Sequence, residues 1–383
     1  MVKTVDAIVI GGGIVGAMTA ATLARRGLAV HLLERGAFGG AVSGGSLACI
    51  NAHMNSLDEL ETLKWCGDAW AGLDDRLGHS FEYNRSGKIT FILRQADVAR
   101  AEAWIAAETP RGVAARLLTP AEVRDVEPGL TGPIVAATWH PEAATVNPFF
   151  AVRAMLADAA DHGATMASHT AVDRILVQNG KVRGVATATG TVEAPHVVIA
   201  AGPWTADVAA TAGVTLPIVP RKAQCLATTA QPPTILRVIG ACESDGGIEA
   251  GYTQIQQARS GQILFNTVLS GGQGDPSGRN AVPEVDRRFV FDSIEMLMHL
   301  FPATRGIELM RSWVRYEAVT PDDRFVIGPA GPEGLLIAAG DGGTGFVRSP
   351  AIAEIIADRI EGRESHFRTD IYAPSRFDAL VEP

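Results

Sequence analysis

Three glycines near the amino terminus have the spacing of a phosphate-binding turn. Gly11, Gly13 and Gly16 fit the pattern G-x-G-x-x-G. The first permits a tight turn, the second lets the backbone approach a pyrophosphate, and the third lets a helix pack closely on a strand. Glu34 follows about twenty residues later, where an acidic side chain accepts hydrogen bonds from ribose hydroxyls and would repel a 2′-phosphate. The chemistry indicated is the binding of a dinucleotide without a 2′-phosphate.

The glycines can act in this way only if a strand precedes them and a helix follows. Residues 7–10 are apolar and predict a buried parallel strand. Residues 17–26 predict a helix that Gly27 ends, and residues 28–33 predict a second strand with Glu34 at its carboxyl end. This order predicts a dinucleotide site. The alternative is a glycine-rich turn in an ordinary βαβ unit.

A second glycine-rich junction lies about three hundred residues further along the chain. Residues 334–340 predict another buried strand, and residues 341–346 are glycine-rich. Residues 36–46 form an additional glycine-rich loop whose amides could approach a phosphate or a flavin edge. NAD needs only the first junction. A cofactor that extends a ring system to a distant loop, as FAD does, needs both.

Three further signals predict where helices begin. Ser56 with Glu59, and Thr119 with Glu122, each have the spacing of a capping box. The pair Ser349–Pro350 is typical of a first helical turn and predicts a helix from there to about residue 359.

The overall charge limits the partners of the chain. The 383 residues carry a formal net charge of −9 without any basic run, which argues against a nucleic-acid partner. Residues 7–24 carry no charge and could be mistaken for a membrane anchor or a signal peptide, but the βαβ pattern explains them better. No other stretch is apolar enough to span a bilayer. We therefore expect a cytoplasmic protein, which would reach a membrane only through a partner.

The cysteines exclude some cofactors. They are widely spaced and form no C-x-x-C pair, at Cys49, Cys66, Cys225 and Cys242. This spacing excludes a Cys-ligated iron–sulfur cluster or a zinc site built within this chain alone. Buried free thiols suit a reducing cytoplasm, and we expect no metal.

The rest of the pattern predicts an α/β fold with two domains. Residues 197–204 form a buried strand that ends in small residues, so this segment returns to the parallel sheet. Strand-like runs dominate residues 221–320 and predict a mostly antiparallel second domain. We expect a discontinuous FAD-binding domain of residues 1–80, 146–220 and 321–383. Residues 81–145 and 221–320 are expected to form a substrate domain.

These motifs carry a family likeness over nearly the full chain. The chain resembles the FAD-dependent D-amino-acid oxidase-like family, which includes glycine oxidase, sarcosine oxidase, D-amino-acid dehydrogenases and the β subunits of heteromeric proline, opine and cyanide-forming dehydrogenases. The matching segments are residues 11–16 with Glu34, 198–204, 320–322, and 340–346 followed by Ser349–Pro350. The resemblance implies a GR-type, Rossmann-like FAD domain with an interleaved antiparallel sheet.

The resemblance also implies a set of residues that hold FAD. They are Gly11, Gly13, Ile14, Val15, Gly16, Glu34, Arg35, Ser43, Gly44, Gly45, Ser46, Val172, Ala201, Gly202, Trp204, Gly340, Asp341, Gly342, Gly343, Thr344, Gly345 and Phe346. The loop 43–46 would lie against the isoalloxazine or the pyrophosphate, the Val172 backbone would meet the adenine, and residues 342–346 would cap the pyrimidine end. Asp341 would bind a ribityl hydroxyl or cap a helix. Monomeric sarcosine oxidase bonds its flavin to a cysteine where this chain has Val314 and Arg315, so we expect noncovalent FAD.

For the substrate site, the resemblance implies anchors rather than a catalytic triad. A bound amine can give up a hydride without an acidic or basic side chain if its α-C–H is well placed. The candidate anchors are Tyr252, Arg315, Tyr316, Glu317 and His53. Tyr252 could instead be a half-buried sheet tyrosine, Arg315 could form a salt bridge with Glu317 or Asp322, and His53 could be a core or surface histidine.

Several positions depart from the family pattern. Glycine oxidase-like members carry a carboxylate-binding arginine where this chain has Glu317, and the usual glycine pair after the serine-rich loop is Ala48–Cys49 here. Arg315 lies one strand residue from the expected arrangement and would face the other side unless a bulge re-aims it. Arg221 and Lys222 are expected to be solvated.

The resulting expectation is an FAD-dependent oxidation of the C–N bond of a small amino acid or N-substituted amino acid to an imine. The electron acceptor would be oxygen, a quinone or a partner subunit. Three alternatives stay open at this point. The chain could be the β subunit of a heteromeric dehydrogenase, a degenerate flavin-binding scaffold, or an aromatic hydroxylase that needs NAD(P)H.

Overall fold

The apolar runs that the sequence predicts as buried strands lie side by side in one six-stranded sheet. The computed structural model describes residues 3–242, 253–266, 284–340 and 342–378. Five parallel strands pair in the order β20 (Leu335–Ala339), β13 (His196–Ile199), β2 (Ala7–Ile10), β3 (Val30–Leu33) and β9 (Thr165–Ala167). An edge strand, β19 (Val326–Pro329), pairs antiparallel with β20. Because the central strands are buried on both faces, their sequences are continuously apolar rather than alternating.

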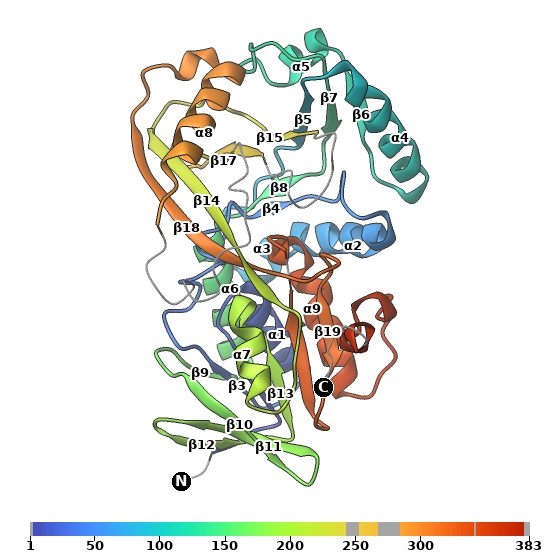
Figure 1. Cartoon of the computed structure of the whole chain (residues 1–383), viewed down its shortest axis with the longest axis vertical. Helices are drawn as coiled ribbons and strands as arrows, with labels where there is room; N and C mark the ends of the chain where they lie inside the picture. The colour runs from blue at the N-terminus through green and yellow to red at the C-terminus, as the bar shows by residue number, and fades with distance from the viewer. Residues whose placement is uncertain (1–2, 243–252, 267–283, 341, 379–383) are drawn as a thin grey trace.

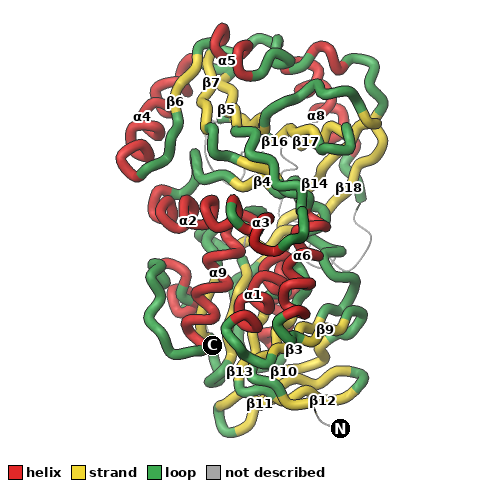
Figure 2. Tube along the Cα trace, turned by 180° about the vertical axis from the view of Figure 1, so that it is seen from behind, coloured by secondary structure: helices red, strands yellow, loops and turns green. Residues whose placement is uncertain are grey.

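Two different layers cover this sheet (Figures 1 and 2). One face carries the helices α1 (Ile14–Arg25), α6 (Pro148–Asp161) and α9 (Gly345–Ile360). The other face packs on helix α7 (Thr205–Ala210) and on a four-stranded sheet of β1 (Lys3–Thr4), β12 (Gly190–Glu193), β11 (Lys181–Thr187) and β10 (Val172–Gln178). This arrangement confirms the predicted α/β class.

The upper half of the molecule in Figure 1 is built on an eight-stranded sheet. Its order is β18 (Leu309–Val319), β14 (Val219–Ala230), β17 (Gln262–Asn266), β16 (Gln254–Gln257), β15 (Val238–Ala241), β5 (Lys88–Ile92), β7 (Ala136–His140) and β6 (Arg116–Leu118). All these pairs are antiparallel except β15 with β5. The sheet joins strands from residues 81–145 with strands from about residue 219 onward, and the domain boundaries themselves stay a prediction.

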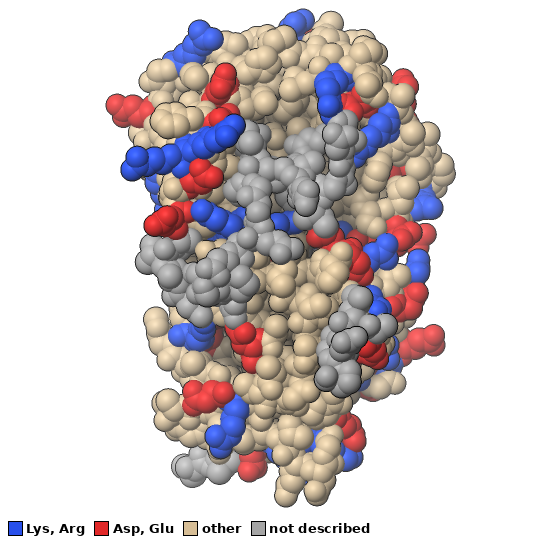
Figure 3. Space-filling view, viewed as in Figure 1, with Lys and Arg blue, Asp and Glu red and all other residues tan. Residues whose placement is uncertain are grey.

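The remaining elements cover or connect the two halves. They are α2 (Leu60–Ala71), α3 (Leu73–Leu77), α4 (Val98–Glu108), α5 (Pro120–Val126), α8 (Arg287–Leu300), β4 (Cys49–Ile50) and β8 (Ala144–Thr145), with short 3₁₀ turns at Leu57–Glu59, Gln95–Asp97, Thr109–Arg111, Gly202–Trp204, Pro302–Thr304, Asp370–Tyr372 and Pro374–Phe377. No helix in the described part of the chain is long and apolar enough to cross a membrane. On the face seen in Figure 3, basic and acidic side chains are interspersed rather than gathered into one patch.

Helix α9 begins earlier than the sequence predicts. It starts at Gly345, so Pro350 lies inside the helix rather than in its first turn. Proline cannot donate a hydrogen bond to the carbonyl four residues back, which is that of Phe346. Trp70 Nε1 donates to this oxygen at 3.0 Å and Ser349 Oγ donates to it at 2.9 Å. Trp70, on the neighbouring helix α2, therefore takes the place of the missing donor. No local sequence pattern predicts this contact.

The capping box predicted at Ser56 is also wrong, because Glu59 binds elsewhere. The Ser56 side chain makes no capping hydrogen bond. Both oxygens of the Glu59 carboxylate accept from Arg348 at 3.0 Å, and Tyr372 Oη donates to the same carboxylate at 2.9 Å. All three residues are buried. The capping box predicted at Thr119 is confirmed, with Pro120 at the first helical position.

Candidate cofactor and substrate site

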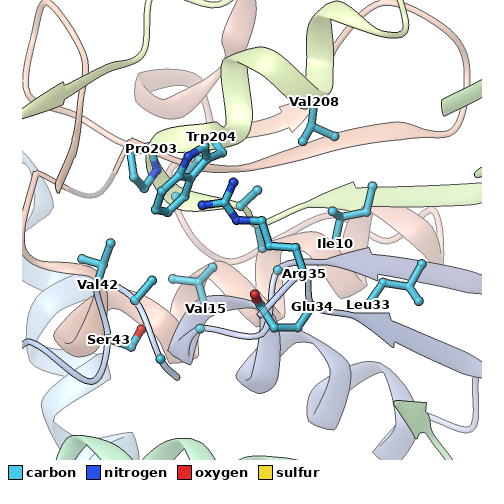
Figure 4. Close-up of a pocket in the computed structure, with 18 of the residues that line it drawn as sticks. Ile10, Val15, Leu33, Glu34, Arg35, Val42, Ser43, Pro203, Trp204 and Val208 are labelled. Carbon is cyan, nitrogen blue, oxygen red and sulfur yellow. The ribbon is translucent and has the colours of Figure 1, made fainter. Parts of the chain in front are cut away.

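A cavity of about 300 Å³ opens at the carboxyl ends of β2, β3 and β13 (Figure 4). Its walls come from the glycine turn after β2, the loop after β3 and the turn after β13, with the last residues of β20 at one side. In open α/β sheets ligands bind at this edge of the strands. The cavity therefore lies where the sequence predicts a dinucleotide.

Two glycines make the turn possible because no other residue would fit. Gly11 has a φ of +111°, and a Cβ placed on it would lie 2.3 Å from the carbonyl oxygen of Ala200. A Cβ on Gly16 would lie 1.9 Å from the carbonyl oxygen of Gly11. Both contacts are with backbone, so a side chain at Gly11 would force the turn away from the end of β13, and one at Gly16 would force helix α1 away from the turn. The close helix–strand packing expected of this motif is thus present.

The Glu34 carboxylate is held at the rim of the cavity by backbone amides. Gly12 N–H donates to Oε2 at 2.7 Å and Gly36 N–H donates to Oε1 at 2.7 Å. A carboxylate oxygen has more than one lone pair, so both can accept a further hydrogen bond. Glu34 can therefore fix the two loops and still accept a ribose hydroxyl.

Helix α1 points its amino terminus at the cavity. Ser43 Oγ accepts a hydrogen bond from the Ile14 N–H at 2.9 Å, which attaches the loop after β3 to the first turn of the helix. Gly13 lies beside this contact, since a Cβ on it would be 3.0 Å from Ser43 Oγ. The start of a helix attracts phosphate through its N–H groups and its dipole. The small residues therefore leave room for a pyrophosphate, and the helix start provides a positive potential for it.

One wall of the cavity is a cation–π pair. The guanidinium carbon of Arg35 lies 3.9 Å from the ring centre of Trp204, and both side chains line the cavity (Figure 4). The pair connects the end of β3 to the turn after β13. Trp204 is thereby held at the mouth of the site.

Removing this guanidinium is expected to weaken FAD binding moderately. The variant Arg35→Ala loses a cation–π contact worth about 0.5–2 kcal/mol, which corresponds to roughly a 2- to 30-fold higher Kd. Titration of the apoprotein with FAD, followed by flavin fluorescence, measures the change. The variant Arg35→Lys keeps the charge, and its Kd for FAD should lie between those of the original protein and Arg35→Ala. An unchanged Kd for Arg35→Ala would mean that this wall does not contribute to cofactor binding.

The predicted cofactor residues fall into two groups around this cavity. Those that line it are Gly11, Gly13, Ile14, Val15, Glu34, Arg35, Ser43, Val172, Ala201, Gly202 and Trp204. Those outside its lining are Gly16, Gly44, Gly45, Ser46, Gly340, Gly342, Gly343, Thr344, Gly345 and Phe346. Asp341 lies outside the described residues. The lining also includes Ala338 and Ala339, which the sequence analysis missed, although small residues at a strand end were a signal for them. The individual roles of all these residues remain predictions.

Among the predicted substrate anchors, Arg315 and Glu317 lie together. Arg315 Nη2 donates to Glu317 Oε1 at 3.2 Å. The expectation that Arg315 turns away is wrong, because the two residues are two apart in a regular strand and share one face. The expectation that Arg221 is solvated is also wrong. Its side chain is only 13% exposed and donates to Glu317 Oε2 at 3.0 Å. The three charges form one cluster.

The other predicted anchors are not in this cluster. Tyr316 pairs with Lys222 and, by strand alternation, points to the opposite side of β18. His53 is 1% exposed, with Nδ1 2.6 Å from the Glu108 carboxylate and Nε2 2.8 Å from the Thr138 hydroxyl. The geometry therefore favours a structural role for His53 in the core over a role as a substrate anchor. Tyr252 lies outside the described residues.

The described part of the chain offers little other chemistry near the cavity. No group of three His, Cys, Asp or Glu side chains in it could hold a metal ion. The described cysteines are free thiols, three of them buried and Cys49 half-buried. Burial raises the pKa of the Cys49 and Cys225 thiols, which keeps them protonated at neutral pH.

Fold and site together define a dinucleotide-binding α/β protein with its cavity at the carboxyl ends of the parallel strands. The chain belongs to the DAO family of FAD dependent oxidoreductases, which matches residues 6–359. Its cofactor is FAD, and the small-residue cavity, the helix start and Glu34 fit the adenosine and pyrophosphate of that molecule.

Known relatives agree with this family at low identity. The chain is 24% identical to glycine oxidase of Bacillus subtilis, with 95% of each chain covered, and 23% identical to sarcosine oxidase subunit beta of Arthrobacter sp, with 98% and 92% covered. It spans about half (55%) of the bifunctional protein ThiO/ThiG of Trichormus variabilis, at 26% identity over 98% of its own length. The crystal structure of L-proline dehydrogenase from P. horikoshii is similar over 100% of both chains, with 26% identity and a TM-score of 0.91.

Proposed function

We propose that this protein oxidises the C–N bond of a small amino acid or N-substituted amino acid to an imine. The observation that carries the proposal is the match of residues 6–359 to the DAO family of FAD dependent oxidoreductases, together with a cavity at the carboxyl ends of the parallel strands. Arg221, Arg315 and Glu317 lie against both glycine-rich loops, beside the expected flavin end. Arg221 Nη1 is also 3.9 Å from Asp323 Oδ1, so two guanidinium groups face two carboxylates there.

The names of the relatives support the same substrate class. Glycine oxidase, sarcosine oxidase subunit beta and D-amino acid dehydrogenase of Neisseria gonorrhoeae are each named for an amino-acid-type amine. Their identity to this chain is 23–26%, so they support the class of substrate rather than one compound.

This reaction depends more on the orientation of the bound amine than on acidic or basic side chains. Bound FAD would accept a hydride from the α-carbon of the amine. The substrate nitrogen loses a proton as the imine forms, and water then hydrolyses the imine to a carbonyl compound and an amine. The chain must hold the neutral amine with its α-C–H directed at the flavin.

An anaerobic titration tests the proposal. The purified holoenzyme is mixed with sarcosine, proline, glycine, D-amino acids and opines in turn, and the visible flavin absorbance is recorded. Bleaching by at least one of these amines is expected. No bleaching by any amine, in a protein whose flavin is reduced normally by dithionite, would contradict the proposal for the isolated chain. NAD(P)H serves as the control for an aromatic hydroxylase, and bleaching by it alone would favour that alternative.

A second candidate is the FAD-carrying β subunit of a heteromeric dehydrogenase. It is favoured by an exposed aromatic pair at the start of α6, Phe149 (53% exposed) and Phe150 (43% exposed). The Phe149 ring lies against Gly44 of the first glycine-rich loop, as a Cβ on Gly44 would be 2.5 Å from Phe149 Cε1. An electron-accepting partner could dock there. Admitting air after bleaching separates the cases: rapid return of the flavin band indicates an oxidase, and return only with an artificial acceptor indicates a dehydrogenase.

A further inference from the structure

Strands β14 and β18 form a long ribbon that runs from beside α8 down to the cofactor side of the molecule (Figure 1). Arg221 and Glu317 are direct partners across this ribbon, and Ala223 and Arg315 are the next pair on the same face. The register is regular from Val219 to Ala227, so these side chains stay on one face. We call Arg221, Arg315 and Glu317 the loop clamp.

Each arginine of the loop clamp binds a different glycine-rich loop. Arg315 Nη1 donates to the carbonyl oxygen of Gly45 at 2.7 Å, and Trp313 Nε1 donates to the same oxygen at 3.0 Å. Arg221 Nη2 donates to the carbonyl oxygen of Gly342 at 2.9 Å. The first loop follows β3 and the second follows β20. Two segments about three hundred residues apart are therefore held by one ribbon.

Glu317 connects the two arginines. Its Oε1 accepts from Arg315 at 3.2 Å and its Oε2 accepts from Arg221 at 3.0 Å. The side chains of the clamp are 6–13% exposed, so their attraction is only weakly screened by water. Gly343 allows the second loop to close on the carboxylate, since a Cβ there would lie 2.7 Å from Glu317 Oε1. Without this carboxylate, two guanidinium groups would face each other with like charge.

We propose that the loop clamp positions the two glycine-rich loops around the flavin end of FAD and does not bind the substrate. The chain of contacts runs from Gly45 through Arg315, Glu317 and Arg221 to Gly342, and it fixes the gap between the loops. Arg315 also donates to Cys225 Sγ at 2.8 Å, so its guanidinium is already engaged on several sides. This inference rests on FAD binding and not on the identity of the amine.

The variant Glu317→Gln tests the loop clamp. It keeps the shape of the side chain but replaces a carboxylate oxygen by an NH₂ group, which cannot accept from an arginine. We expect the Kd for FAD, titrated into the apoprotein, to rise about 10-fold or more, since bonds between charged groups are lost. The visible spectrum of the bound flavin should also lose fine structure as the loops loosen around the ring.

Two comparisons keep the test decisive. Arg288→Gln removes a charge from an exposed position on α8, where Arg288 pairs with Asp292 at 3.6 Å and lies outside the clamp. It should leave the Kd and the flavin spectrum unchanged. Glu317→Asp keeps the charge but is too short to reach both arginines, and it should give an intermediate Kd even if Glu317→Gln fails to fold.

The same variants separate the clamp from a substrate-binding role. If Glu317→Gln and Glu317→Asp bind FAD within 2-fold of the original Kd with an unchanged spectrum, the proposal is overturned. An increase only in the KM of the amine, at saturating FAD, would assign the cluster to the substrate instead. The FAD titration needs no amine, so its outcome stands even if no amine bleaches the flavin.

Discussion

The variant Gly16→Ala is expected to lose FAD binding almost completely. Its new methyl group would lie 1.9 Å from the carbonyl oxygen of Gly11, where neither the helix nor the turn can move without opening the phosphate-binding site. A displacement that costs roughly 3 kcal/mol would weaken FAD binding about 100-fold or more. The measurements are the flavin content of the purified protein and a fluorescence titration of the apoprotein with FAD.

Gly67→Ala is the matched control. Gly67 lies within helix α2, and a Cβ there would meet no atom within 4 Å. The same substitution should therefore keep FAD affinity and stabilise the helix by about 0.5–1 kcal/mol. If Gly16→Ala binds FAD as well as Gly67→Ala does, the close packing of α1 on the glycine turn is not required for the cofactor.

Replacing Glu59 with alanine is expected to be the most destabilising single change among the charged residues of the helical layer. It would leave Arg348 buried without its carboxylate and would remove the acceptor of the Tyr372 hydroxyl. Burial raises the pKa of Tyr372, so this hydroxyl stays protonated and donates. Breaking a buried pair by removing one partner costs about 3–5 kcal/mol. Urea denaturation of the apoprotein measures the loss.

An exposed ion pair in the same region provides the comparison. Arg368 and Asp370 form a salt bridge at 3.0 Å on the surface. Asp370→Ala should leave the urea midpoint nearly unchanged, because water screens exposed pairs. Equal losses for Glu59→Ala and Asp370→Ala would show that burial of the Glu59–Arg348 pair has no special weight in stability.

Local signals predict which residues of the first βαβ unit lie at the cavity. Gly11, Gly13 and Glu34 lie within one βαβ unit, so their spacing along the chain fixes their arrangement in space. The capping box at Thr119 is predicted for the same reason, since its two partners are three residues apart. At Ser56 the same pattern fails, because Arg348 and Tyr372 approach Glu59 from distant parts of the chain.

The charged cluster and the packing of the distant elements depend on contacts that no local pattern contains. Arg221 and Glu317 are far apart in sequence and meet only through the register of β14 with β18. Pro350 is tolerated inside α9 because Trp70 supplies the missing hydrogen bond. His53 is enclosed by Glu108 and Thr138, which come from a helix and a strand of the other half. Each of these outcomes is decided by packing between elements rather than by the residues themselves.

The order of strands in the central sheet has a consequence for synthesis of the protein on the ribosome. β2 and β13 are neighbours, and the other edge of β13 pairs with β20, whose last residues line the cavity. A nascent chain therefore cannot close this edge until residue 339 has left the exit tunnel. Such long-range pairing slows folding and leaves apolar strands open to aggregation in the meantime. FAD capture is thus expected only after β20 has paired with β13 and completed this side of the sheet.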